Sequence, residues 1–269
     1  MTYEFDSTTA STTIQRFITG KLLQSGMSGY VVGLSGGIDS ALACTLAVRA
    51  VGPEKVLAVM MPYKTSSEHS LADARRLIDQ LGIEHRHIEI TPMIDAYYDI
   101  IDDSMRIRAG NKMARERMSI LFDLAFDMNR LVLGTGNRTE ICLGYTTIYG
   151  DSACSLNPIG ELYKSEVRQL ARELGVPDTI ITKPPSADLW VDQTDEGEIG
   201  VTYEQIDRIL RLIIDDGVRS MAELETAGMS TTDISRVVSM INRNAFKRRM
   251  PEIAPLGKTP VPERVELDN

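Results

Sequence analysis

The segment 30–40 restricts the possible folds more than any other part of the sequence. It reads Y-V-V-G-L-S-G-G-I-D-S. The apolar run 30–34 predicts a buried strand, and a helix-forming run over 41–50 follows the two adjacent glycines. Adjacent glycines let the backbone turn tightly and bring several N–H groups close to a ligand. Because these amides lie where a helix begins, the turn predicts an anion-binding site.

The polar residues of the turn indicate which anion it binds. Ser35 and Ser40 add hydroxyl donors, whereas Asp39 suits an anion only when a cation accompanies it, as Mg²⁺ accompanies polyphosphate. The turn has no lysine, so it is not the G-x-x-x-x-G-K-[ST] loop of many nucleotide-binding proteins. It resembles the S-G-G-x-D-S loop of the ATP pyrophosphatases, which hold the β,γ-pyrophosphate and cleave ATP between its α and β phosphates. A glycine-rich turn without a ligand is the alternative.

Composition narrows the class of protein. The chain has 269 residues, of which 43% are hydrophobic, enough for a substantial core without disulfides. The 29 basic and 38 acidic residues give a net charge of −9, which argues against a nucleic-acid partner. The three cysteines form no C-x-x-C motif, which favours thiols in a reducing compartment. No signal peptide or membrane span is recognisable, so we expect a soluble cytoplasmic enzyme without a membrane partner.

The order of the predicted elements indicates an α/β fold. Apolar runs predict strands over 30–34, 56–61 and 131–133, and a short strand is expected over 86–90. Helical spacing predicts helices over 9–24, 41–50, 66–81, 94–101, 112–128, 163–174, 203–215, 220–227 and 231–246. Gly110 and Asn111 are expected to lie just before the helix 112–128. Residues 137–160 are expected to form a loop and residues 178–200 a flap. Alternating strands and helices predict a doubly wound parallel sheet in one domain, residues 1–269, with helices at its C-terminal end.

Two loops are expected to meet at one edge of this sheet. The loops 33–40 and 134–140 follow the first and fourth strands, and ligands of such sheets bind at the carboxyl ends of the strands, where the strand order reverses. Asp39 and Glu140 can then supply two oxygens to Mg²⁺. Thr135 lies in the second loop and can contact ATP. A solvated loop glutamate and an ordinary turn threonine are the alternatives.

Three further polar residues stand out, less sharply. Arg115 belongs to a run of three cations on one predicted helix, which is also the pattern of an ordinary solvated face. Lys164 lies at the start of a predicted helix, where the helix dipole disfavours a cation, and such a placement hints at function. Ser186 follows two prolines, which place its hydroxyl in a rigid turn.

Taken together, the motifs resemble those of the ammonia-dependent NAD synthetases from about residue 33 to residue 247. The matching motifs are S-G-G-I-D-S-A, N-x-x-A-R-x-R-M, L-G-T-G-N-x-x-E, G-Y-x-x-x-Y-G-D, N-P-I-G-x-L-Y-K, K-x-P-S-A-D-L and Q-T-D-E-x-E-I-G-x-x-Y. The resemblance implies a homodimer with an adenine nucleotide alpha-hydrolase-like fold. It also implies an amide synthetase that uses ATP and Mg²⁺ to adenylate a carboxylate, most simply that of deamido-NAD. Ammonia then attacks the acyl carbon, and AMP and pyrophosphate are the other products.

The resemblance assigns roles to individual positions. It implies ATP binding by Gly33, Leu34, Ser35, Gly36, Gly37, Ile38, Asp39, Ser40, Thr135, Lys164 and Ser186. It implies Mg²⁺ binding by Asp39 and Glu140, and catalytic roles for Ser35, Asp39 and Lys164. Positions 115, 148, 155 and 247, here Arg115, Ile148, Ser155 and Lys247, correspond to the contacts with the dinucleotide substrate. The segment before residue 33 is too short for an ammonia-generating domain, so we expect free ammonia or a separate donor.

The sequence departs from the family pattern on the acid-substrate side. Ile148 replaces a lysine, Ser155 replaces an aspartate, and Phe246 stands where the family often has a histidine. A different acid, such as nicotinate mononucleotide or an unrelated carboxylate, is therefore an alternative to deamido-NAD. An enzyme that adenylates a tRNA base and a non-catalytic nucleotide-binding module are two further alternatives, but the chain shows no added basic or metal-binding module, and it retains Asp39, Glu140 and Lys164.

Overall fold

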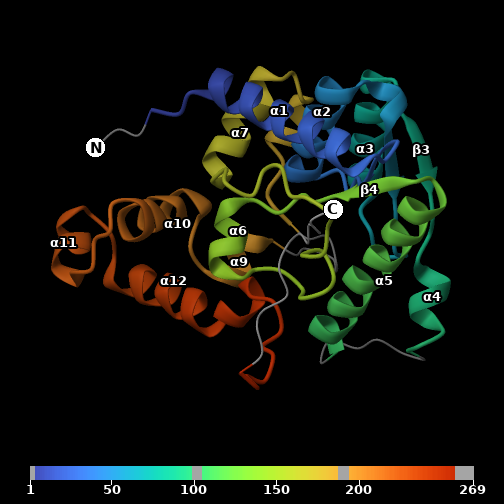
Figure 1. Ribbon diagram of the computed structural model, residues 1–269. Helices are drawn as coiled ribbons and strands as arrows, with labels where there is room; N and C mark the ends of the chain where they lie inside the picture. The colour runs from blue at the N-terminus through green and yellow to red at the C-terminus, as the bar shows by residue number, and fades with distance from the viewer. Residues whose placement is uncertain (1–3, 99–104, 187–193, 258–269) are drawn as a thin grey trace.

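The computed structural model describes residues 4–98, 105–186 and 194–257 (Figure 1). Within these ranges, four strands form one parallel sheet in the order β3-β2-β1-β4: β1 (Gly29–Gly33), β2 (Val56–Met60), β3 (Glu84–His87) and β4 (Arg130–Leu133). Val31 pairs with Leu57 on one side and with Val132 on the other. The parallel sheet predicted from the alternating elements is confirmed, and the third strand lies slightly earlier in the chain than expected.

Helices cover both faces of the sheet. One face packs against α1 (Ser7–Ser25), α2 (Ile38–Val51), α3 (Glu68–Leu81), α7 (Lys164–Glu173) and α8 (Asp178–Ile181), which share a buried core with β1 and β2. The other face packs against α4 (Thr91–Asp95) and α5 (Arg106–Asp127). Along β1, Val32 belongs to the first core and Val31 to the second, as the alternation of side chains in a strand requires. The doubly wound arrangement is therefore confirmed.

A third core lies away from the sheet. It joins α6 (Arg138–Leu143) to α10 (Tyr203–Leu210), α11 (Met221–Thr226) and α12 (Thr231–Arg243), and Figure 1 shows α10, α11 and α12 grouped at one side of the molecule. The remaining elements are α9 (Asp195–Ile199), the 3-10 helices η1 (Pro53–Lys55) and η4 (Ala245–Arg248), and the π-helix η3 (Arg211–Asp215), which continues α10. The C-terminal helices predicted from hydrophobic spacing are confirmed. Among the described residues, no helix combines the length and apolar character that a membrane crossing requires.

Several predicted boundaries were wrong. Helix α5 begins at Arg106, so Gly110 and Asn111 lie inside it; Gly110 is buried in a packed helix, and tertiary packing has overridden its low helix propensity. The predicted loop 137–160 contains α6, which a capping box at Asn137 starts. In place of the predicted helix 94–101, the structure has the shorter and earlier α4, which ends at Asp95. Residues 99–101 of the predicted helix lie outside the described part of the chain. The predicted flap contains α8 and α9, and residues 187–193 between them lie outside the described residues.

Candidate active site

The carboxyl ends of β1 and β4 open into one large cavity of about 1170 Å³. The loop after β1 and the loop after β4 both line it, so the two loops meet as the predicted topology requires. The inner face of α5, the start of α7, α9 and the end of α12 complete the wall. Pockets for drug-sized ligands measure roughly 300–1,000 Å³, so this cavity has room for more than one small ligand.

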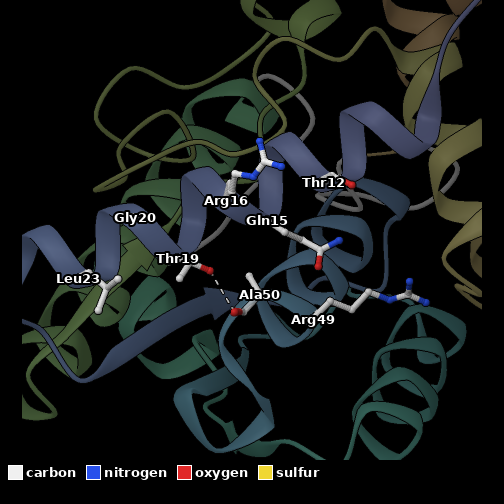
Figure 2. Close-up of a pocket in the computed structure, with 8 residues that line it drawn as sticks. All are labelled: Thr12, Gln15, Arg16, Thr19, Gly20, Leu23, Arg49 and Ala50. Atoms are coloured by element: carbon white, nitrogen blue, oxygen red, sulfur yellow. Dashed lines mark hydrogen bonds between the residues drawn. The ribbon is translucent and has the colours of Figure 1, made fainter.

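A second hollow lies between α1 and α2 (Figure 2). It has a volume of about 460 Å³, and Thr19 Oγ1 donates to the carbonyl of Ala50 across it, over 3.1 Å. Ala50 lies at the far end of α2, whereas the start of α2 follows the carboxyl end of β1. This hollow is therefore remote from the strand ends at which ligands bind in such sheets.

The serine–glycine turn after β1 has the geometry of an anion-binding loop. Gly36 has a φ of 79°, and a Cβ atom there would lie 2.1 Å from the carbonyl oxygen of Ser70, so only glycine fits. Ser35 Oγ lies 3.1 Å from Ser40 Oγ and accepts the N–H of Gly37 over 3.2 Å. The amides that open α2 precede the first i→i−4 bond of the helix and are available to an anion.

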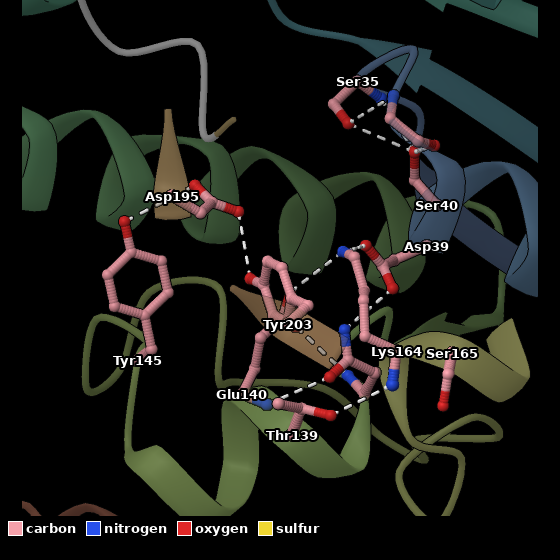
Figure 3. Close-up of polar contacts among 12 residues, drawn as sticks. Ser35, Asp39, Ser40, Thr139, Glu140, Tyr145, Lys164, Ser165, Asp195 and Tyr203 are labelled. Atoms are coloured by element: carbon pink, nitrogen blue, oxygen red, sulfur yellow. Dashed lines mark hydrogen bonds and ion pairs between the residues drawn. The ribbon is translucent and has the colours of Figure 1, made fainter. Parts of the chain in front are cut away.

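The ammonium group of Lys164 joins the two loops (Figure 3). Its Nζ lies 2.5 Å from Asp39 Oδ2 and 3.5 Å from Glu140 Oε1, and the lysine side chain is only 2% exposed. The three predicted charged residues, Asp39, Glu140 and Lys164, therefore form one cluster. A cation at the first position of α7, which the helix dipole disfavours, is held there by two carboxylates.

Asn137 fixes the position of Asp39 relative to Glu140. Its Nδ2 donates to Asp39 Oδ1 over 2.8 Å, and its Oδ1 accepts the N–H of Glu140 over 2.9 Å. In return, Glu140 Oε2 accepts the N–H of Asn137, which completes the capping box of α6. Asn137 is fully buried, so this single side chain fixes the first turn of α6 against the start of α2.

The pKa values of Glu140 and Lys164 are both shifted from their ordinary values. Burial, and then the charge of Asp39, raise the pKa of Glu140 to about 8, while Lys164 opposes the shift. Burial acts to lower the pKa of Lys164, but Asp39 and Glu140 outweigh it, and the pKa lies above its usual value. The ammonium group therefore stays charged at neutral pH, and Glu140 is poised to bind or release a proton.

Comparison with known proteins identifies the family. A family model described as NAD synthase matches residues 10–251. The chain belongs to the NAD synthase family. An NH(3)-dependent NAD(+) synthetase of Trichlorobacter lovleyi is 49% identical to it over 244 residues, which cover 90% of this chain and 89% of the relative. This NAD synthase family member is therefore a carbon–nitrogen ligase of NAD biosynthesis, and its family uses ATP.

Two solved structures have the same fold as this NAD synthase family member. The NH3-dependent NAD synthetase from Campylobacter jejuni, in complex with a nitrate ion, is 38% identical, with a TM-score of 0.78 over 93% of this chain and 100% of that chain. The NMN synthetase from Francisella tularensis is 35% identical, with a TM-score of 0.82 over 93% of this chain and 99% of that chain. These likenesses agree with the fold class predicted from the sequence.

The residues to which the NAD synthetase motifs assign ATP contacts lie on the cavity wall, apart from Gly36. Gly33, Leu34, Ser35, Gly37, Ile38, Asp39, Ser40, Thr135, Lys164 and Ser186 all line it. Gly36 is buried behind the turn against Ser70, where it shapes the loop. The structure thus brings the predicted nucleotide residues together from four separate segments of the chain.

The residues that correspond to substrate contacts in the NAD synthetases are more scattered. Lys247 lines the cavity and donates to the carbonyls of Gly144 and Thr146 over 2.8 and 2.6 Å, and burial lowers its pKa. Arg115 and Ile148 are not among the cavity-lining residues; Arg115 is exposed, and its Nε donates to the carbonyl of Ile148 over 3.3 Å.

Ser155, which stands where the NAD synthetases usually have an aspartate, pairs with the edge of β4. Its N–H donates to the carbonyl of Val132 over 2.8 Å, and its Oγ accepts the N–H of Val132 over 3.1 Å. Its side chain is therefore engaged with the sheet rather than with the cavity. The suggested roles of Arg115, Ile148 and Ser155 in substrate binding remain predictions.

Several residues of the site were not predicted from the sequence. Asp195 is 5% exposed and lines the cavity, where it accepts hydrogen bonds from Tyr203 Oη over 3.1 Å and from Tyr145 Oη over 3.4 Å (Figure 3). Burial raises the pKa of Asp195. Arg117 lines the cavity from α5, two residues after Arg115. Asp195, Tyr203 and Arg117 all belong to the quoted motifs, but the motifs gave them no role.

The donor set fits one Mg²⁺ ion shared with a nucleotide. Mg²⁺ prefers oxygen ligands and is usually held by one or two carboxylates together with substrate phosphates and water. Asp39 and Glu140 provide two such carboxylates, which are 17% and 19% exposed and lie close to the phosphate-binding turn. Within the described residues, no group of three or more metal-binding side chains occurs. A cation at this site thus depends on ligands from the substrate.

Proposed function

We propose that this protein adenylates deamido-NAD with ATP and transfers ammonia to the acyl carbon, giving NAD, AMP and pyrophosphate. The observation that carries the proposal is the single cavity, which joins the serine–glycine turn and Lys164 to a second basic end at Lys247. One end suits a triphosphate. The rest leaves room for a second, anionic ligand with its carboxylate close to the α-phosphate.

The side chains at the first end suit adenylation. When the substrate carboxylate attacks the α-phosphorus, a P–O bond breaks and negative charge builds up on the departing pyrophosphate. Lys164 and the amides of residues 38–40 lie where they can stabilise that charge without reorganising. Asp39 and Glu140 would hold Mg²⁺, which supplies charge stabilisation to the phosphates when it is bound.

The second step needs no nucleophile from the protein. Ammonia attacks the acyl carbon, the bond to AMP breaks, and one proton is released from nitrogen. The cavity wall therefore has to bind the adenylate and exclude water rather than form a covalent intermediate. The relatives described as NH(3)-dependent support ammonia as the nitrogen source.

Nicotinate mononucleotide is a second candidate substrate. Ile148 and Ser155 depart from the family pattern, and the similar structure from Francisella tularensis is described as an NMN synthetase. Against this candidate, neither side chain lines the cavity, so their substitution alone gives no reason to expect a smaller acid. We therefore place deamido-NAD first.

We also propose that the protein acts as a homodimer through the outer face of α4 and α5. Met93 and Tyr97 expose apolar side chains on α4 and the turn that follows it, and Phe122 and Phe126 do so on α5, where Phe126 is 92% exposed. Exposed apolar residues that cluster on one face are a feature of interaction surfaces. A second copy of the chain is the occupant that the family resemblance favours.

A pyrophosphate-release assay tests the substrate. The enzyme is incubated with ATP, Mg²⁺ and ammonium together with deamido-NAD, nicotinate mononucleotide or a panel of aromatic acids. The proposal expects the highest kcat/KM with deamido-NAD and its conversion to NAD. A higher kcat/KM with the mononucleotide would replace deamido-NAD as the substrate, and pyrophosphate release with none of the acids would overturn the proposed reaction.

A further inference from the structure

A buried carboxylate behind the active site connects the elements that carry its charged residues. Asp207 lies on α10, is 2% exposed and does not line the cavity. Its Oδ1 accepts the hydroxyl of Thr139 over 2.5 Å, and its Oδ2 accepts the N–H of Ser165 over 2.8 Å. A buried carboxylate is costly unless donors satisfy it, and here each oxygen has a donor from a different helix.

Both donors are direct neighbours of active-site residues. Thr139 precedes Glu140 in the first turn of α6, and Ser165 follows Lys164 in the first turn of α7. Thr139 Oγ1 also accepts the N–H of Lys164 over 3.0 Å. One carboxylate and one hydroxyl therefore tie the backbone of Lys164 to the turn that carries Glu140.

The position of Asp207 compensates an unfavourable feature of α7. The first amides of a helix lack partners within the helix and carry partial positive charge, which the cation of Lys164 increases. Asp207 places a negative charge against these amides. It thereby favours a helix start that the lysine alone would disfavour.

Helix α10 contacts Lys164 in a second way. Tyr203 lies one turn before Asp207 on the same face of α10, and its ring centre is 4.9 Å from Lys164 Nζ. Asp207 thus holds the backbone of Lys164, and Tyr203 flanks its side chain. Both restrain the ammonium group where Asp39 receives it.

We infer that Asp207 is a positioning residue for catalysis, which acts through Thr139 and Ser165 to hold Lys164 and Glu140 at the spacing that adenylation requires. The inference rests on the proposed function for its kinetic effect. Its structural part, the restraint of Lys164, does not depend on the identity of the acid.

The Asp207→Asn variant removes one acceptor with little change in shape. An asparagine offers one oxygen and one NH₂ group, so one of the two positions that now accept from Thr139 and Ser165 becomes a donor. We expect kcat for pyrophosphate release to fall by roughly 10–100-fold, as for residues that orient a ligand-binding side chain, while KM for ATP changes by less than about threefold.

Variants of Thr139 separate this role from a general loss of stability. Thr139→Val removes the hydroxyl and should reproduce the kinetic defect, whereas Thr139→Ser keeps the hydroxyl and should retain activity. Because both residues act in one network, the Asp207→Asn/Thr139→Val double variant should be no slower than the slower single variant. Multiplying defects would show that the two residues act independently and would contradict the inference.

The matched control is Asp73→Asn. Asp73 is also a buried carboxylate that accepts a threonine hydroxyl, from Thr179 over 2.7 Å, but it lies on α3 and does not contact Lys164. We expect this variant to lower the melting temperature and to keep the kcat of the wild type. If Asp207→Asn keeps a kcat within about threefold of the wild type, the inference is overturned.

A second measurement needs no turnover. Lys164 is almost fully buried, so an amine-acetylating reagent should modify it slowly in the folded protein. Acetylation of Lys164 is measured by peptide mass spectrometry, at a temperature well below the melting temperatures of the wild type and the two variants. It should be faster in Asp207→Asn than in the wild type or in Asp73→Asn. An unchanged rate would refute the restraint. Absence of pyrophosphate release by the wild type would instead refute the proposed reaction and leave this measurement valid.

Discussion

Replacing Lys164 by methionine gives the sharpest test of how the charged cluster is built. Methionine is unbranched and of similar length, so it fills the space of the lysine stem but carries no charge. The ammonium group lies 2.5 Å from Asp39 Oδ2 and 3.5 Å from Glu140 Oε1. Its removal leaves two neighbouring carboxylates, both mostly buried, without their cation.

The expected loss of stability follows from burial. Removing one partner of a buried ion pair typically costs about 3–5 kcal/mol of unfolding free energy. Glu140 moderates this cost because its pKa is already about 8, and loss of the opposing Lys164 charge raises that pKa further. We therefore expect a loss near 3 kcal/mol at pH 8, smaller at pH 5, and partly restored by the double variant Lys164→Met/Glu140→Gln.

The expected loss of catalysis is larger than any loss of substrate binding. Removal of one preorganised donor to a developing negative charge typically lowers kcat by about 10²–10³-fold. The rate of adenylation is measured as pyrophosphate release with the preferred acid. The unfolding free energy is measured by urea titration at pH 5 and pH 8. The double variant should regain stability without regaining kcat.

The control is another lysine–carboxylate pair with nearly the same separation but different burial. Lys64 Nζ lies 2.6 Å from Asp95 Oδ2, and the two side chains are 53% and 37% exposed. Lys64→Met should leave both stability and kcat near the wild-type values, because solvent screens an exposed pair. A kcat above about a tenth of the wild type in Lys164→Met would refute the role assigned to its charge.

Three further predictions concern other parts of the molecule. In metal-free buffer, the unfolding free energy should fall as the pH rises from about 5 to 8. In this range Glu140 keeps its proton in the folded protein, whereas in the unfolded chain, where its pKa is the ordinary 4.5, it has already released it. Glu140→Gln should flatten this slope in urea titrations. Gly36→Ala should lower the unfolding free energy by more than about 2 kcal/mol, because its Cβ atom would meet the carbonyl of Ser70. Gly175 has a φ of 75° but open space around it, so Gly175→Ala should lower the unfolding free energy by only about 1 kcal/mol. Equal losses of stability in thermal unfolding would contradict the contact with Ser70. Phe126→Glu should give a folded monomer by light scattering if the outer face of α5 forms the dimer, and an unchanged dimer would exclude that face.

The parts of the fold that the sequence predicted depend on local signals. Apolar runs identified β1, β2 and β4, and hydrophobic spacing identified the long helices, because burial of a strand or of a helix face leaves a periodic trace. The side chains of β3 are exposed and polar, and the predicted strand 86–90 overlaps it at only two residues. The start of α5 was missed because Gly110 has low helix propensity but is packed inside the helix. The helix α6 was missed because its six residues are too few for a periodic pattern, although Asn137 and Glu140 carry its capping box.

In the candidate site too, some residues could be predicted from the sequence and others could not. Asp39, Glu140 and Lys164 could be predicted because each lies in a conspicuous motif, and the topology of a parallel sheet brings two of those motifs to one edge. Asp207 carried no such signal. It meets Thr139 across 68 residues of sequence, and only the packing of α10 against α6 and α7 creates that contact. An isolated acid on an amphipathic helix looks like solvated surface until its neighbours are known.

Lys164 shows how such supporting residues can be sought. A lysine at the first position of a helix opposes the helix dipole, so a fold that keeps it must provide nearby negative charge or lose helix stability. In this chain Asp39 and Glu140 face the ammonium group, while Asp207 faces the amides behind it. The violation was visible in the sequence and its compensation was not, because compensation comes from other segments. Local rules are broken most often at functional sites, so a residue placed against local preference directs attention to the buried acids packed around it.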